Sequence, residues 1–178
     1  GPSEILIVAD GKTNPKYAAA DLLSQAEHDR MASAVLVTDS LDFAKKVSEE
    51  IEKQIPELLR CDIARASVDN NGKIILASSI NEAIDIANEI APEHLELCLD
   101  DAKERLSDIK NAGSVFLGRS CPEAVGDYYA GPNHVLPTSG TARFSSPLSV
   151  DDFIKKTQFT YYTKDALKKV SGDIYKFA

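Results

Sequence analysis

The sequence predicts an α/β fold, a layered αβα domain of the incomplete Rossmann-like kind with a mainly parallel sheet. Short continuous apolar runs, which are typical of strands covered on both faces, recur along the chain. Segments with the apolar spacing of helices separate these runs. With 178 residues, 43% of them hydrophobic, the chain is long enough to bury one core. Strands that alternate with helices favour parallel pairing.

The first strand and helix follow from the opening residues. The apolar run Glu4–Ala9 predicts a buried strand. A helix is expected from Pro15, because Asn14 suits the N-cap and proline suits the first helical position. This helix should end near His28 or Arg30.

The next segment repeats this pattern. Ser33–Thr38 predicts a second buried strand, and Ser40 can cap an amphipathic helix that ends before Pro56. The pattern of residues 61–69 leaves strand and helix open. Asn70–Gly72 predicts a hairpin-like turn.

A third strand and helix come after that turn. Lys73–Ala77 predicts the strand, and Ser78 or Ser79 the cap of the helix, with Glu82 placed for a capping box. Residues 94–99 then alternate as a strand does. One face carries Leu95, Leu97 and Leu99, and the other carries His94, Glu96 and Cys98.

The remaining chain has weaker patterns. A short helix is expected over residues 101–109 and a buried strand over Gly113–Gly118. A long loop, Glu123–Phe153, follows with almost no apolar periodicity, and long ordered loops usually carry function. Ser149 should cap a helix start, and residues 157–163 predict a strand.

The terminal segment 164–178 predicts a helix broken at Gly172. We therefore expect an α/β catalytic-domain portion over residues 1–148. Residues 149–178 should add a C-terminal strand and helix to the same domain.

Composition excludes several classes of function. The net charge of −8 argues against nucleic acid and anionic membrane surfaces as partners. No apolar run reaches the length of a spanning helix, and the first residues lack a basic signal-peptide region. Three cysteines without a C-x-x-C motif suggest neither a disulfide framework nor a cysteine zinc site, and they are consistent with a reducing cytoplasm. Glycine-rich nucleotide motifs and the G-x-S-x-G motif are absent from the sequence.

All three histidines stand beside carboxylates or amides. Gln25 and His28 share a face of the first helix, although a histidine at a helix C-terminus is also explained by the helix dipole. Glu93 and His94 could divide acid and base work, and the alternative is a polar face of a half-exposed strand.

Asp127 and His134 lie in the loop that glycines and prolines constrain. Carboxylate oxygen and imidazole nitrogen both suit zinc, so this loop could contribute to a divalent-metal site. The alternative is a solvated surface loop. Ends of elements in open α/β sheets are where ligands collect.

Five strings together resemble histidinol dehydrogenase, the last enzyme of histidine biosynthesis. They are "GPSEILIVAD", "ADLLSQAEHD", "APEHLEL", "NAGSVFLG" and "EAVGDYYAGPNHVLPTSGTARFSSPLSVDDF". The similarity runs in order from Gly1 to about Tyr162, and the last string is the most specific. The resemblance implies oxidation of L-histidinol to L-histidine through an aldehyde, with two NAD⁺ reduced at one zinc-bearing site.

The resemblance also implies roles for residues at matching positions. His94 would remove protons during the oxidations, and Glu93 would activate the water that hydrates the aldehyde. The implied zinc ligands are Gln25, His28 and Asp127. The implied substrate-binding residues are Ser3, Gln25, His28, Glu93, Asp127 and His134. The family forms homodimers with a shared active site.

Members of that family are longer than this chain. Segments that supply most NAD contacts, a further zinc-ligand histidine and a substrate-binding glutamate have no counterpart in this sequence. We therefore expect the isolated chain to be inactive, to bind zinc weakly or not at all, and to self-associate through an exposed sheet edge. Two alternatives are a non-catalytic α/β domain that binds a small molecule, and a zinc hydrolase in which Glu93 activates water.

Overall fold

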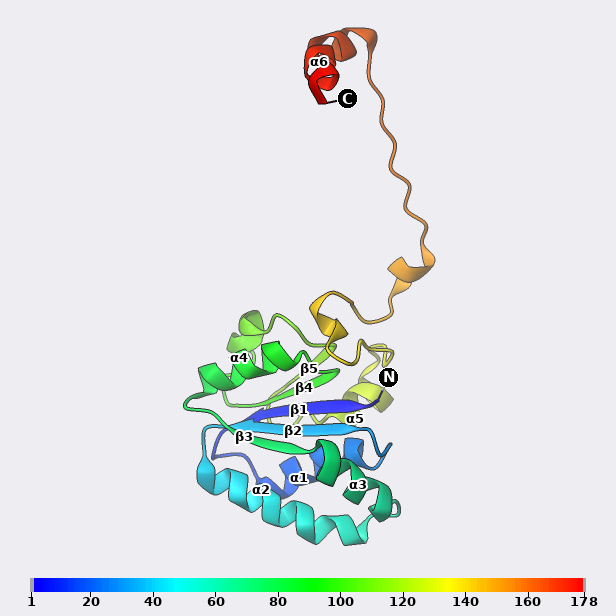
Figure 1. The fold of residues 1–178 in the computed structure, drawn as a ribbon. Helices are drawn as coiled ribbons and strands as arrows, with labels where there is room; N and C mark the ends of the chain where they lie inside the picture. The colour runs from blue at the N-terminus through cyan, green and yellow to red at the C-terminus, as the bar shows by residue number, and fades with distance from the viewer. Residues whose placement is uncertain (1, 178) are drawn as a thin grey trace.

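The computed structural model describes residues 2–177. Gly1, the first residue of the expected portion 1–148, and Ala178, the last residue of the expected portion 149–178, lie outside the described residues. Its sheet has five strands, all parallel, in the order β3-β2-β1-β4-β5 (Figure 1). The strands are β1 (Glu4–Ala9), β2 (Ser33–Thr38), β3 (Lys73–Leu76), β4 (His94–Cys98) and β5 (Ser114–Leu117). The predicted α/β class and parallel sheet are confirmed.

Helices cover both faces of this sheet. The helices α1, α2 and α3 lie on one face and α4 on the other, which gives the three layers seen in Figure 1. The longer helices are α1 (Pro15–Ala26), α2 (Leu41–Gln54), α3 (Cys61–Asn71), α4 (Ile80–Ile90) and α6 (Lys164–Phe177), with the short α5 (Glu123–Val125) before a π-helical turn, η3 (Gly126–Ala130). The 3₁₀ turns are η1 (Ile55–Glu57), η2 (Glu104–Asp108), η4 (Thr141–Arg143) and η5 (Val150–Phe153).

The central strand β1 shows why the apolar runs are continuous. Ile5 and Ile7 face the helices α1 and α2, while Leu6 and Val8 face α4. All four side chains are at most 1% exposed, because both faces of the strand are covered. On its two edges β1 pairs with β2 and β4, so strand order reverses between β1 and β4.

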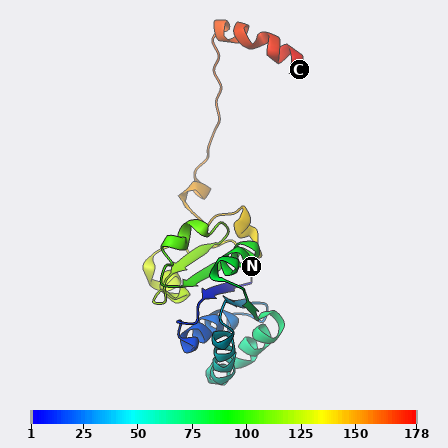
Figure 2. The ribbon, with the colours of Figure 1, turned by 90° about the vertical axis from the view of Figure 1, so that its left-hand side faces the viewer.

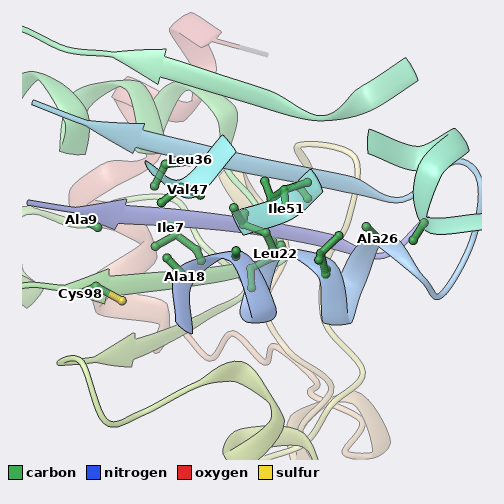
Figure 3. Packing of buried hydrophobic residues seen from close by; sticks show 14 of the residues in the cluster. Ile7, Ala9, Ala18, Leu22, Ala26, Leu36, Val47, Ile51 and Cys98 are labelled. Atoms are coloured by element: carbon green, nitrogen blue, oxygen red, sulfur yellow. The ribbon is translucent and has the colours of Figure 1, made fainter. Parts of the chain in front are cut away.

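Helix α1 packs directly on this strand. Asn14 caps it by accepting the Lys16 N–H, and Pro15 takes the first position, as expected. Ala18, Leu22 and Ala26 recur every four residues and form the stripe that faces the sheet (Figure 3). The helix ends at Ala26, two residues before the expected His28, because the His28 N–H turns back to the Gln25 carbonyl in a tighter turn.

Two further expectations in the first half are resolved. Residues 61–69, left open above, belong to helix α3, which packs against α1 and β2. The hairpin-like turn expected at Asn70–Gly72 is wrong. Asn70 and Asn71 end α3, Gly72 caps it, and the chain enters a strand that is parallel to β2. The Asn-Asn-Gly pattern marks a helix end as well as a hairpin, and helix packing decided between them.

The cap of α4 is Ser79, which accepts the Glu82 N–H, while the Glu82 carboxylate accepts the Ser78 N–H. The short helix expected over residues 101–109 is the 3₁₀ turn η2, and the strand expected over 113–118 is β5.

The C-terminal segment differs from its prediction. Ser149 is the cap, as expected, and forms a capping box with Asp152, but the helix stops after Phe153. Residues 157–163 pair with no strand in the described chain, so the strand expected there is wrong, and α6 continues through Gly172 without a break. Figures 1 and 2 show α6 held away from the sheet by an extended segment. A β-rich composition produces a strand only where a partner strand is in reach.

The structure bears on membrane insertion as well. None of the helices within residues 2–177 has the length and apolar character needed to cross a bilayer.

Candidate functional site

The candidate site lies at the amino edge of the sheet, where β1 and β4 begin. Ser3 precedes β1, and Glu93 precedes His94, the first residue of β4. Ile5 pairs with His94, so the starts of these two strands are neighbours. Ala91 adopts the left-handed conformation, with φ of 55°, and turns the chain from α4 into β4. The usual ligand crevice of an open α/β sheet lies at the opposite, carboxyl edge, whereas Glu93 and His94 stand at the amino end of β4.

The imidazole of His94 is held in one orientation. Its Nδ1 lies 2.8 Å from the carbonyl oxygen of Glu4. Because a carbonyl only accepts, Nδ1 carries the proton and Nε2 of the neutral ring carries a lone pair. Nε2 is buried without a hydrogen-bond partner and lies 3.6 Å from Oδ1 of Asp127. A buried lone pair without a partner suits a group that takes a proton or binds a ligand.

Glu93 and Glu4 brace each other beside this ring. The Glu93 carboxylate accepts the Glu4 N–H at 3.0 Å, and the Glu4 carboxylate accepts the Glu93 N–H at 3.3 Å. Oε2 of Glu93 also lies 3.5 Å from Nδ1 of His94. Burial raises the pKa of Glu93 above its ordinary value, against the opposing effect of the Glu4 N–H. A carboxylate with a raised pKa is a better proton acceptor at neutral pH.

Asp127 reaches His94 from the loop. It stands on η3, whose start passes close to the ring of Phe116 on β5. A Cβ on Gly126 would lie 2.3 Å from Cε1 of that ring, so only glycine permits this approach. The Phe116 ring centroid lies 6.0 Å from that of His94. The long loop therefore holds its carboxylate against the sheet, and the alternative of a free solvated loop does not apply to this part of it.

Glu123 connects the loop with α1. Its side chain is buried and interacts with the Gln25 amide and the Asp127 carboxyl group. Burial raises the pKa of Glu123, and the neighbouring Asp127 raises it further. Gln25, predicted from the sequence, is itself 2% exposed.

A second pair of carboxyl groups lies behind this site. Glu96, two residues beyond His94, is 1% exposed, and its carboxyl group lies next to that of Asp21 of α1. Burial raises the pKa of Glu96 to about 8 and that of Asp21 to about 6. Every residue of β4 is buried. The alternative explanation for Glu93 and His94, the polar face of a half-exposed strand, therefore does not apply.

The donor atoms fit a divalent cation. One ligand atom each from His94, Glu123 and Asp127 lies within 4.8 Å of the other two. Nitrogen and carboxylate oxygen are donors that zinc accepts. The Nε2 lone pair, which has no protein partner, fits a bound group at this place.

The remaining predicted residues take different places. Ser3 is part-buried, and its carbonyl accepts the Ser33 N–H next to the site. His28 and His134 are exposed, and within residues 2–177 neither one joins the hydrogen bonds or ion pairs around His94. The structure thus gathers Gln25, Glu93, His94 and Asp127, with Ser3 at the same edge.

The carboxyl edge between β1 and β4 holds a separate cavity of about 230 Å³. Arg119 crosses it, donating to Asp10 at 2.7 Å and also to Asp100, which in turn accepts from Lys12 at 2.8 Å. Its basic groups are therefore neutralised by the chain's own carboxylates. A cavity of this size is below the roughly 300–1,000 Å³ of small-molecule pockets, and far below the need of a dinucleotide.

Sequence reasoning missed Glu4, Glu96 and Glu123. Alternation in β4 did assign Glu96 to the face of His94, and a strand covered on both faces would bury it. Glu123 stands four residues before Asp127, a spacing that places both on one side of a helical turn. Glu4 contributes through its backbone carbonyl and N–H as well as its carboxylate, and no residue pattern reveals the backbone contacts.

The fold and the site define a class: Rossmann-like α/β domains with a buried histidine and neighbouring carboxyl groups at the amino edge of the parallel sheet. The sequence profile described as histidinol dehydrogenase matches residues 1–178, so the chain belongs to the histidinol dehydrogenase family.

Individual relatives agree with this assignment. The histidinol dehydrogenase of Bacillus cereus is 57% identical over 178 residues, all of this chain and 42% of that protein. That of Caldanaerobacter subterraneus is 60% identical over 171 residues, 96% of this chain and 40% of that protein. The crystal structure of histidinol dehydrogenase from Elizabethkingia anophelis superimposes with a TM-score of 0.88 at 41% identity, over 100% of this chain and 41% of that one. The chain thus spans about two fifths of the length of these relatives.

Proposed function

We propose that this chain is the part of a zinc- and NAD-dependent histidinol dehydrogenase that carries its acid–base groups. The observation that supports it most directly is the fixed orientation of His94, whose Nε2 lone pair is buried and unpartnered next to Asp127. Family membership supplies the reaction, which is oxidation of L-histidinol to L-histidine through an aldehyde.

His94 is the proposed base of both oxidations. In the first, Nε2 takes the alcohol proton while the carbon transfers a hydride to NAD⁺, which leaves the aldehyde and NADH. In the second, the hydrated aldehyde loses a hydroxyl proton to Nε2 and a hydride to a second NAD⁺, which leaves the carboxylic acid. The lone pair on Nε2 suits this task because Nδ1 stays bound to the Glu4 carbonyl.

Glu93 is the proposed base of the hydration step between the oxidations. A water molecule loses a proton to its carboxylate and adds to the aldehyde carbon, while the carbonyl oxygen takes the proton that Nε2 of His94 received in the first oxidation. This gives the hydrate and restores the Nε2 lone pair for the second oxidation. The raised pKa of Glu93 matches this role, since a carboxylate with a higher pKa accepts a proton more readily near neutral pH. The mutual hydrogen bonds with Glu4 hold the carboxylate in place.

Zinc is proposed to bind at Asp127, with Gln25 and His28 as the further ligands that family resemblance implies. When bound, the ion would supply positive charge that orients the imidazole and amine of the substrate. Gln25 interacts with Glu123 next to Asp127, which is consistent with a shared ligand set. Ser3 and His134 are proposed substrate contacts. The nicotinamide cofactor, a dimeric partner and a cytoplasmic location are likewise proposed from the family.

The test uses a full-length protein that contains this segment, with histidinol, NAD⁺ and zinc. Formation of two NADH for each histidinol consumed is the expected result. We also expect this chain alone to give no turnover, because the family needs segments that the chain does not supply. Histidinol binding by the full-length protein without NADH formation would instead favour a small-molecule binding domain. Hydrolysis of esters or amides would favour a zinc hydrolase.

A further inference from the structure

Glu96 is a carboxylic acid in the middle of the core. It lies on β4 between Leu95 and Leu97, and its side chain is 1% exposed. Side chains two apart on a strand share a face, so Glu96 lies on the same face as His94. A buried carboxyl group is costly unless its polar atoms find partners. The partners of Glu96 therefore indicate why it is there.

Two segments supply those partners. Oε1 accepts the backbone N–H of Glu123, at the start of α5, at 2.7 Å. The Glu96 carboxyl group also lies next to that of Asp21 on α1. Glu96 thus accepts a hydrogen bond from α5 and lies against α1.

Both contacts lie one helical turn from a site residue. Asp21 is four residues before Gln25 on α1, and Glu123 is four residues before Asp127 on the α5–η3 turn. Residues four apart on a helix stand above one another. Glu96 lies on β4, the strand that begins with His94. From this strand it contacts the two helical turns that carry Gln25 and Asp127.

We propose that Glu96 is a positioning residue of the site, a buried carboxyl group that fixes the α5–η3 turn relative to β4 and α1. Its role is to keep Asp127 within reach of His94, and it exchanges no proton with the substrate. This inference deepens the function proposed above. It rests on that function where it is tested by kcat and KM for histidinol. The position of the α5–η3 turn can be measured without turnover.

Three variants of Glu96 in the full-length protein test the inference. Glu96→Gln keeps one donor and one acceptor without an ionisable group. Glu96→Asp keeps the carboxyl group but is one methylene too short, and Glu96→Leu keeps only the volume. Glu104→Gln makes the same chemical change at an exposed position and serves as the control. The measurements are amide hydrogen exchange of residues 119–130, and kcat and KM for histidinol.

We expect Glu96→Gln to match the control, with exchange within about twofold of wild type and kcat within about fivefold. Glu96→Asp and Glu96→Leu should raise exchange in residues 119–130 at least tenfold and lower kcat at least tenfold, with a smaller change in KM. If Glu96→Gln is as damaging as Glu96→Leu, or if Glu96→Asp and Glu96→Leu leave exchange unchanged, the inference is overturned. If wild type does not oxidise histidinol, the proposed function fails, and the exchange pattern alone decides the role of Glu96.

Discussion

The Nδ1 atom of His94 lies 2.8 Å from the carbonyl oxygen of Glu4, across the β1–β4 boundary. This one contact determines which ring nitrogen carries the proton and which keeps the lone pair. It also ties the candidate base to the central strand of the sheet. The base is thereby held by the most deeply buried part of the fold rather than by a loop.

Substitutions of His94 separate two roles of its ring, the contact of Nδ1 with the Glu4 carbonyl and the lone pair on Nε2. Asparagine at position 94 keeps a donor near the place of Nδ1 for the Glu4 carbonyl but removes Nε2. We expect His94→Asn in the full-length protein to lower kcat at least ~100-fold, the scale of general-base catalysis, with little change in melting temperature. His94→Gln should lose as much activity and more stability, because its amide is displaced from the Glu4 carbonyl. A His94→Asn variant with more than a tenth of wild-type kcat would argue against His94 as the base.

The raised pKa of Glu96 predicts how stability depends on pH. In the folded protein this pKa is about 8, against an ordinary value of 4.5. Between these values the unfolded chain has released the proton that the folded protein keeps, so the free energy of unfolding falls as pH rises. The slope for one such proton is about 1.4 kcal/mol per pH unit. Asp21 adds to the slope only below about pH 6, since its own pKa is raised to about 6.

Urea unfolding between about pH 6 and pH 8 measures this slope. Glu96→Gln carries no titrating group at position 96, so its free energy of unfolding should change less with pH than that of wild type. Glu104→Gln, at an exposed position, should keep the wild-type slope. Equal slopes for wild type and Glu96→Gln would contradict a neutral Glu96.

Gly126 allows the close approach of the loop to β5. A methyl group at this position would overlap the Phe116 ring, which must then shift. We expect Gly126→Ala to lower the free energy of unfolding by roughly 1–3 kcal/mol, the usual cost of overpacking. Gly172→Ala is the matched control: nothing lies within 4 Å of its added Cβ, and it should stabilise helix α6.

A second substitution tests whether overlap with the Phe116 ring causes this loss of stability. Phe116→Leu makes space next to Gly126, so the double variant should lose less stability than the sum of the two single variants. Strictly additive losses, measured by thermal or urea unfolding, would show that Gly126 is needed for its backbone conformation and not for contact with Phe116.

Zinc binding by the full-length protein distinguishes two ligand sets. Family resemblance implies Asp127 and His28, so Asp127→Asn and His28→Asn should each weaken zinc affinity at least tenfold. Glu123→Gln should change it by less than about threefold. Competition with a chromogenic chelator measures the affinities. A large loss for Glu123→Gln with none for His28→Asn would assign the ion to the His94, Glu123 and Asp127 group, whose donor atoms lie within 4.8 Å of one another.

Local sequence determined the parts of this protein whose stability is local. Asn14 and Pro15 start α1 where helix capping predicts, and the Leu95–Leu97 alternation assigned the two faces of β4 correctly. Continuous apolar runs predicted the parallel sheet, because strands covered on both faces have no polar side. The Glu93–His94 pair and Asp127 were singled out from sequence, by residue type and by resemblance, and both carboxyl groups lie beside the His94 ring in the structure.

Tertiary structure alone decided which polar groups meet. Glu4 and Glu123 stand far apart in sequence, and they join His94 only because β1, β4 and the loop converge at one edge of the sheet. Residues 157–163 have the composition of a strand, but hydrogen-bonded pairing needs a neighbouring strand that the described chain does not place there. Capping and periodicity act over a few residues, whereas strand pairing and side-chain convergence depend on distances that only the folded chain sets.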